Sequence, residues 1–187
     1  MNYLDAIRAY APKNEQEERD KAFFLRFAAE HPDCLLRDND LAHFTASAWV
    51  VNPDRSKVLM VWHNIYKSWS WTGGHADGEN DLAAVALREV REETGVERAA
   101  LASEALFSLE SLTVDGHVKR GEYLHSHLHL NLTYLIEADD REALRVKPDE
   151  NSGVRWFTPE GALAACTEPW MIENVYRKLI DAVRAMR

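Results

Sequence analysis

The sequence contains only two cysteines, Cys34 and Cys166, and no repeated or low-complexity segment. Two widely separated thiols make neither a disulfide framework nor a zinc ribbon, so we expect a reducing compartment. The chain also lacks the about 18 consecutive apolar residues of a membrane span. Residues 1–20 are charged throughout and hold no apolar run typical of a signal peptide. These absences predict a cytoplasmic protein with no membrane partner.

Positive charge is also scarce. The chain has 22 Lys and Arg residues and 31 Asp and Glu residues, which gives a net charge of −9. A protein that binds a nucleic-acid polymer needs a basic patch, so we do not expect that partner. Small phosphate compounds remain possible, since a bound divalent cation inverts the local charge and prefers carboxylate ligands. The 187 residues suffice for one good core and are too few for two large domains.

The first forty residues are predicted to be a helical arm. Apolar residues in the first ten positions recur at helical spacing. Asn14 is typical of an N-cap that opens a second helix, and His31-Pro32 ends it because the residue before a proline avoids helical geometry. Nothing in the arm suggests chemistry. We therefore predict that residues 1–40 serve in packing or in a homodimer, beside a domain of residues 41–187.

The rest of the chain alternates between strand and helix patterns. Residues 44–50 alternate apolar and polar types, which predicts a half-buried strand, and Asn52-Pro53-Asp54 is a turn before a second strand at 58–62. Further strands are expected at 106–114, 123–137 and 154–157, and helices at 81–94, from Thr158-Pro159 and from about Pro169. This order predicts an α/β (α+β) fold, a mixed β-sheet between helices with an N-terminal helical arm.

The most informative segment is the helix that ends near Gly95. Glu89 lies three residues before Glu92 and four before Glu93, so the three carboxylates share one helix face and repel one another. A divalent cation would remove this conflict by taking their oxygens as ligands. A solvated acidic face is the alternative that the charge pattern alone leaves open.

The glycine-rich loop at 73–79 leads into this helix, so its backbone can approach an anion closely. Loop and helix together resemble the Nudix box, G-x5-E-x7-R-E-U-x-E-E-x-G-U, where U is a bulky aliphatic residue. Residues 88–96 match its second half in full, and Gly74 falls on its expected position. The lone glutamate of the first half departs from the pattern, because Asn80 occupies its position and Glu79 comes one residue early. The resemblance is specific over 73–96, extends loosely over about 44–180, and excludes the arm.

The resemblance implies a Nudix-type fold and a Mg²⁺-dependent hydrolase, with Mn²⁺ as a possible substitute, that cleaves the pyrophosphate linkage of a nucleoside diphosphate joined to another moiety. The implied metal ligands are the Gly74 carbonyl and the carboxylates of Glu89, Glu92 and Glu93. Arg88 would hold a glutamate in place. The base that activates water would be Glu89, or Glu150 from the acidic pair outside the box. The partner would be a small nucleotide-type substrate, whose identity no loop motif indicates.

Two further groups could contact that substrate. Trp69 and Trp71 could stack on a base or sugar, or could fill the interface between sheet and helix. His125, His127 and His129 alternate along one predicted strand and would face one side. We predict that His127 and His129 line the substrate cleft; zinc binding by the three is disfavoured because no cysteine or acidic fourth ligand lies nearby.

Two other functions are compatible with such a fold. Isopentenyl diphosphate isomerase, which shares it, places a cysteine immediately before its Gly-His, whereas this chain has Gly73 there. A Nudix-like sensor would bind a nucleotide without cleaving it, but such proteins tend to lose box glutamates. This chain keeps Glu89, Glu92 and Glu93, which favours an enzyme.

Overall fold

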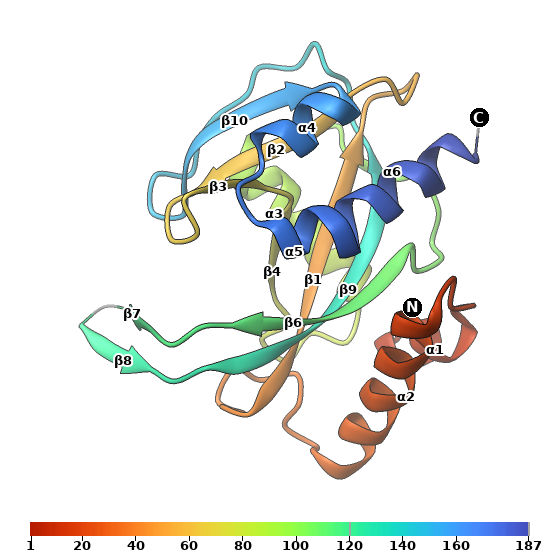
Figure 1. The fold of residues 1–187 in the computed structure, drawn as a ribbon, viewed down its shortest axis with the longest axis vertical. Coiled ribbons are helices and arrows are strands. Elements are labelled where there is room, and N and C mark those ends of the chain that lie inside the picture. Colours follow the sequence, from red (N-terminus) through yellow and green to blue (C-terminus); the bar gives the residue numbers. More distant parts are fainter. Residues whose placement is uncertain (120, 187) are drawn as a thin grey trace. The chain divides into compact units, whose positions relative to one another are not determined.

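The computed structural model describes residues 1–119 and 121–186, drawn in Figure 1. The chain divides into two compact units. The first contains Met1–Ser47, Gly74–Val85 and Glu104–Tyr134, and the second contains Ala48–Gly73, Ala86–Ser103 and Leu135–Arg187. Among the described residues, no helix is long and apolar enough to cross a membrane.

The first unit combines two N-terminal helices with long antiparallel strands. It contains α1 (Tyr3–Ala9), α2 (Glu15–Glu30), β6 (Ser108–Val114), β7 (His117–Lys119), β8 (Glu122–Leu124) and most of β9 (His127–Glu137). β6 pairs with β9 from Ser108 opposite Thr133 to Val114 opposite His127. β7 and β8 form a separate hairpin that extends from the ends of β6 and β9 (Figure 1).

The arm packs on the strands of this unit through the rings of Tyr3 and Phe24, which contact Phe44, and through one buried carboxylate. Asn14 caps α2 as predicted, because its side chain accepts the Glu17 amide at 2.9 Å, and α2 ends before His31. Glu17 is fully buried, where it accepts hydrogen bonds from the Tyr10 hydroxyl at 2.8 Å and the Ser108 hydroxyl at 3.1 Å. These contacts hold α2 on β6. A role of the arm in dimerisation stays a prediction.

The second unit carries the remaining strands and the C-terminal helices. It contains β2 (Val58–His63), β3 (Ser68–Ser70), β5 (Ala100–Leu101), β10 (Asn151–Phe157), α4 (Pro159–Ala165), α5 (Pro169–Met171), the π-helical turn η1 (Ile172–Tyr176) and α6 (Arg177–Arg184). Thr158 caps α4 as predicted, because its side chain accepts the Gly161 amide at 3.1 Å. In Figure 1, α4 lies beside β10 and is followed by α5 and α6.

Four elements have residues in both units: β1 (Ala42–Val51), β4 (Thr72–His75), α3 (Leu82–Thr94) and β9. The strand order of the main sheet is β10-β2-β1-β9-β5, with β3 paired to β2, β4 to β1 and β6 to β9. The hairpin expected around Asn52 is present, with Val51 opposite Val58. A mixed sheet with helices confirms the predicted α/β class.

The predicted half-buried strand at 44–50 is wrong in one respect, because every residue of β1 is buried. The polar positions tolerate burial since they have partners. The hydroxyls of Thr45 and Ser47 both donate to the Asn131 side-chain oxygen, at 3.1 and 2.8 Å. Hydrogen bonds of this kind offset the cost of removing a hydroxyl from water.

Two other strand predictions are corrected. The strand expected at 123–137 is interrupted, since β8 ends at Leu124 and β9 begins at His127. Ser126 lies in the interruption, where its hydroxyl accepts the Gly116 amide at 3.0 Å, and β8 turns to pair with β7. The strand expected at 154–157 starts earlier, at Asn151, with an irregular register between Asn151 and Val154.

Candidate active site

The helix α3 presents the carboxylates because its opposite side is apolar. Val85, Ala86 and Val90 are fully buried. Gly95 ends the helix with a φ of +75°, and a Cβ there would lie 2.8 Å from the Cβ of Arg145. Glycine is the residue that adopts this left-handed conformation without steric cost, so the predicted C-cap is confirmed.

The start of α3 shows what the displaced glutamate of the box does. Asp81 caps the helix by accepting the Ala84 amide at 3.2 Å. Glu79 is exposed, and its carboxylate accepts the Asp81 amide at 2.9 Å. Glu79 therefore stabilises the turn before the helix.

The three box glutamates differ in burial. Glu89 and Glu93 are 9% and 3% exposed, whereas the Glu92 side chain is 46% exposed. Burial raises the pKa of Glu93 to about 8 and raises the pKa of Glu89 above its ordinary value, and each also feels a neighbouring carboxylate. A solvated acidic face does not describe this arrangement, since two of its carboxylates have left water.

One backbone group already holds Glu93. The Gly73 amide donates to a Glu93 carboxylate oxygen at 2.8 Å, which favours the ionised form and fixes the side-chain orientation. Gly73 and Gly74, predicted to lie in a loop, belong to the strand β4, and the expectation that this segment approaches a ligand stays a prediction. The metal-binding carbonyl of Gly74 likewise stays a prediction.

Lys147 joins the box to the acidic pair predicted outside it. Its ammonium nitrogen lies 3.1 Å from a Glu92 oxygen and 3.0 Å from a Glu150 oxygen, so those two oxygens are at most about 6 Å apart. The Arg88 guanidinium also contacts this cluster, 3.4 Å from Glu89 and 3.8 Å from Glu92. The structure therefore brings Arg88, Glu89, Glu92, Glu93 and Glu150 together, as the sequence predicted.

A buried asparagine places the segment that carries Glu150. Asn151 is fully buried and donates from its side chain to the Glu93 carbonyl at 3.0 Å, while its oxygen accepts the Lys147 amide at 3.3 Å. Sequence reasoning missed Lys147 and Asn151. The sequence contains one indication of their role, their position beside the acidic pair. The spacing along the chain does not predict contact with a helix more than fifty residues earlier.

The donor set fits a hard divalent cation. Carboxylate oxygens from three residues on one helix are the ligands that Mg²⁺ and Mn²⁺ accept. The burial of Glu89 and Glu93 adds a second reason, because a buried carboxylate needs a cation or a proton. These residues are thus suited to hold a divalent cation.

The two tryptophans have different environments. Trp71 is 8% exposed and its ring packs edge-on against Tyr176 at 5.6 Å, so its position favours the packing interpretation over stacking on a base. Trp69 is half-buried and contacts the rings of Trp62 and Phe157 at 5.9 and 4.9 Å. Of the two, Trp69 is the more exposed, and its contact with a substrate stays a prediction.

The histidines do not form the set expected from one strand. His125 lies outside β9, is exposed, and pairs with Asp40 at 3.2 Å. His127 and His129 instead adjoin His43, and His75 completes the group. Sequence reasoning missed His43 and His75, because they come from other segments of the chain.

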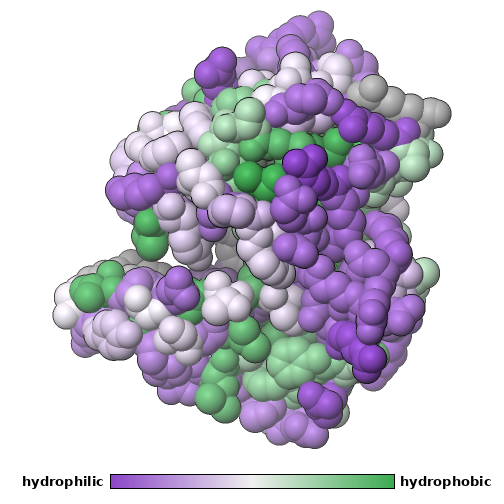
Figure 2. All heavy atoms as spheres, in the orientation of Figure 1, coloured by the Kyte–Doolittle hydropathy of each residue, from purple (hydrophilic) through white to green (hydrophobic). Residues whose placement is uncertain are grey.

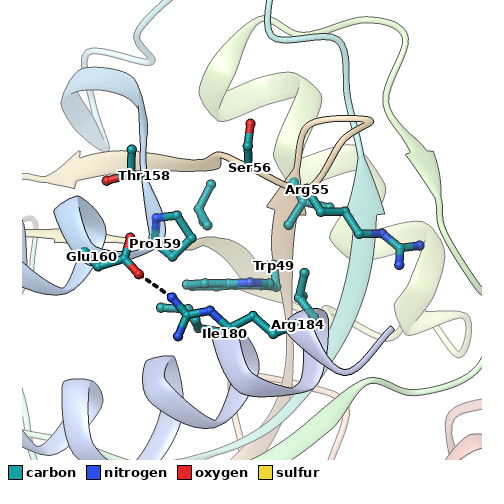
Figure 3. Close-up of a pocket in the computed structure, with 11 residues that line it drawn as sticks. Trp49, Arg55, Ser56, Thr158, Pro159, Glu160, Ile180 and Arg184 are labelled. Atoms are coloured by element: carbon teal, nitrogen blue, oxygen red, sulfur yellow. Dashed lines mark hydrogen bonds and ion pairs between the residues drawn. The ribbon is translucent and has the colours of Figure 1, made fainter. Parts of the chain in front are cut away.

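The second unit also contains a cavity of about 240 Å³, shown in Figure 3. Trp49, Pro159 and Ile180 point into it, and the ion pair of Glu160 with Arg184 crosses one side. Figure 2 shows hydrophobic side chains gathered over this region of α4 and α6. The cavity is smaller than the about 300–1,000 Å³ of typical ligand sites and shares no lining residue with the carboxylate cluster. We assign no substrate to it.

Known structures share this fold at low sequence identity. A hydrolase of the NUDIX family from Clostridium perfringens is 21% identical with a TM-score of 0.55, over 78% of this chain and 98% of that one. The C. elegans Ap4A hydrolase is 16% identical with a TM-score of 0.54, over 76% and 96%. The E. coli dihydroneopterin triphosphate pyrophosphohydrolase is 13% identical with a TM-score of 0.55, over 74% and 94%.

A comparison with curated proteins gives no match. The model of the NUDIX domain matches residues 41–182, which is most of the chain and includes the whole carboxylate helix. The chain therefore belongs to the Nudix family of hydrolases.

Proposed function

We propose that this Nudix hydrolase cleaves the pyrophosphate linkage of a nucleoside diphosphate joined to another moiety, in a reaction that requires Mg²⁺ or Mn²⁺. The observation that carries the proposal is the carboxylate cluster of Glu89, Glu92 and Glu93, with Glu150 held beside it. A bound divalent cation would neutralise charge on the bridging phosphates and act as a Lewis acid. Glu92, Glu93, Glu89 and the Gly74 carbonyl would hold that cation.

The remaining roles follow from the positions of the side chains. Arg88 orients Glu89 and Glu92 through the contacts described above. Glu150 is exposed to water beside Lys147, so its carboxylate can take a proton from an attacking water. Glu89, more buried, is the other candidate for that proton transfer. Trp69, His127 and His129 are proposed substrate contacts.

The substrate class is open, so the first experiment is a panel assay. The purified protein is incubated with ADP-ribose, dinucleoside polyphosphates including Ap4A, dihydroneopterin triphosphate, oxidised nucleotides, sugar nucleotides and coenzyme A compounds, with and without Mg²⁺. We expect cleavage of at least one compound between two phosphorus atoms, dependent on the metal. Specific binding of a nucleotide with no cleavage of any compound would instead indicate a sensor.

Replacing one ligand separates the proposed site from any contaminating activity. We expect Glu92→Gln and Glu93→Gln each to lower kcat/KM by at least about 100-fold. Removal of one preorganised electrostatic group from a reaction centre typically lowers kcat about 10²- to 10³-fold. Glu97→Gln is the matched control, an exposed glutamate just after the helix. Unchanged metal-dependent hydrolysis in either variant would show that the site is elsewhere.

A further inference from the structure

Four histidines from three separate segments meet in the first unit. His43 opens β1, His75 ends β4, and His127 and His129 lie in β9. The His43 ring centroid lies 5.1 Å from that of His75, 5.1 Å from that of His127 and 5.0 Å from that of His129. We call these four residues the histidine cluster. It is independent of the carboxylate helix in its residues and in its chemistry.

The nitrogens of the cluster are close enough to share one ion. One ring nitrogen from each of His43, His75 and His129 lies within 4.8 Å of the other two. Because Zn–N bonds are about 2.0–2.1 Å, two nitrogens bound to one ion are at most about 4.2 Å apart. Small side-chain rotations would therefore close the site. The ring of His127 lies 5.1 Å from that of His43 and 5.2 Å from that of His129, which makes it the candidate for a fourth ligand.

His43 is already in the form that binds a metal. It is 3% exposed, and its Nδ1 lies 2.9 Å from the Asn39 carbonyl oxygen. A carbonyl oxygen only accepts hydrogen bonds, so Nδ1 carries the proton and neutral His43 has its lone pair on Nε2. That Nε2 is buried and has no hydrogen-bond partner among the described residues. Metal-binding histidines are typically held in this way, by a hydrogen bond from the other ring nitrogen.

The same hydrogen-bond pattern recurs at His127, whose Nδ1 lies 3.0 Å from the His125 carbonyl oxygen. Burial also lowers the pKa of His43, which favours the neutral, ligating imidazole. The nearby carboxylate of Asp77 is engaged by Arg37, whose Nε donates to it at 2.7 Å. The cluster thus offers imidazole nitrogens, which suit zinc, copper, nickel or iron rather than magnesium.

We propose that His43, His75, His127 and His129 bind one divalent transition-metal ion, for which Zn²⁺ is the probe. The four histidines share no residue with the carboxylates that would hold Mg²⁺, so the chain would bind two cations through different ligand sets. The single-strand zinc set considered from the sequence, with His125, is replaced by residues from β1, β4 and β9. The proposal does not depend on the hydrolytic function.

The test uses the full chain without a polyhistidine tag, since a tag would itself bind the metal. After treatment with a chelator, Zn²⁺ is titrated in competition with a chromophoric chelator, and excess Mg²⁺ is present throughout. We expect one equivalent of Zn²⁺ to bind. His75→Asn and His129→Asn should each weaken Zn²⁺ binding by at least about 100-fold. Loss of a residue that only hydrogen-bonds to a metal ligand already lowers metal affinity about 10- to 100-fold.

Matched controls make each result decisive. His125→Asn removes an exposed histidine next to the cluster and should leave the affinity unchanged. Glu92→Gln should also leave Zn²⁺ binding unchanged while it abolishes Mg²⁺-dependent hydrolysis. His75 and His129 are half-buried, so their variants are expected to fold, and circular dichroism checks this. Co²⁺ spectra of the wild type should show visible bands typical of nitrogen ligands.

Three results would overturn the proposal. One is a wild-type chain that binds less than one equivalent of Zn²⁺ at micromolar concentration. Another is equal affinity in folded His75→Asn, His129→Asn and wild type. The third is loss of Zn²⁺ binding in Glu92→Gln, which would place the ion on the carboxylate helix.

Discussion

Residues of one type take different roles in this site according to their surroundings. The Glu92 side chain is about half exposed, whereas Glu93, one residue later, is buried with a pKa of about 8. Lys147 then bridges Glu92 to Glu150. The roles of metal ligand and base therefore depend on which carboxylate is desolvated and which remains accessible to water.

We predict that Glu150 is the base and Glu89 a metal ligand. Glu150→Gln should lower kcat by about 10²- to 10⁴-fold, the usual contribution of a general base, and leave the Mg²⁺ concentration for half-maximal activity unchanged. Glu89→Gln should instead raise that Mg²⁺ concentration. Steady-state kinetics across a Mg²⁺ series measures both.

Asp149→Asn is the control for this pair, because Asp149 is the exposed neighbour of Glu150. Full activity in Glu150→Gln would contradict the assignment. A loss of kcat at saturating Mg²⁺ in Glu89→Gln alone would transfer the role of base to Glu89.

At the scale of secondary structure, the residues at the two ends of α3 fix where the carboxylate helix begins and ends. α3 begins at the Asp81 cap and ends at Gly95, and the segment with Glu150 is tied to the last turn of α3 through Asn151. A change at the end of this helix should therefore destabilise the fold around the proposed metal ligands Glu92 and Glu93.

Gly95→Ala tests this. The φ of +75° costs an alanine about 1–2 kcal/mol, and its Cβ would also meet the Arg145 Cβ at 2.8 Å. We expect the free energy of unfolding in urea to fall by more than about 2 kcal/mol. Gly121→Ala is the matched control, since Gly121 has a φ of +87° with nothing within 4 Å of the added Cβ. An equal loss in both variants would refute the role of the Arg145 contact.

At the scale of the whole molecule, the buried carboxylates make stability depend on pH and on metal. In an unfolded chain Glu93 titrates near 4.5, and in the folded chain near 8. The folded state thus binds more protons between these values, so the stability that protonated Glu93 contributes is fully present below about pH 4.5 and is lost as the pH rises through 8. A cation bound to the carboxylate reverses this trend.

We therefore predict that, in EDTA, the Tm of the wild type falls between pH 5 and pH 8, and that Glu93→Gln flattens this slope. Each pKa unit of difference corresponds to about 1.4 kcal/mol, which makes the effect measurable. Mg²⁺ should raise the wild-type Tm most at pH 8. Differential scanning calorimetry at both pH values, with and without Mg²⁺, provides the test. A Glu93→Gln variant with the wild-type slope would assign the dependence to other groups.

Local signals were sufficient for much of the fold and for half of the site. The caps at Asn14 and Thr158 and the left-handed Gly95 were predictable because each depends on a few neighbouring residues. The carboxylate helix was predictable for the same reason, since its three glutamates follow helical spacing. The Nudix box adds Arg88 and the glycine loop. By contrast, β1 was expected to be half-buried, because its alternation shows which residues are polar and does not show the hydrogen bonds that Thr45 and Ser47 donate to Asn131 when buried.

The sequence by itself indicated three glutamates on one helix as candidate cation ligands, and histidines at alternate positions of one strand as candidate substrate contacts. Only the tertiary structure decided which of them meet. Lys147, Glu150 and Asn151 reach Glu92 and Glu93 across more than fifty residues, and His43 and His75 join His127 and His129 from other strands. Such contacts depend on strand pairing and burial, and spacing along the chain encodes neither. Desolvation, which sets the proton affinity of Glu93, likewise exists only once the chain has folded.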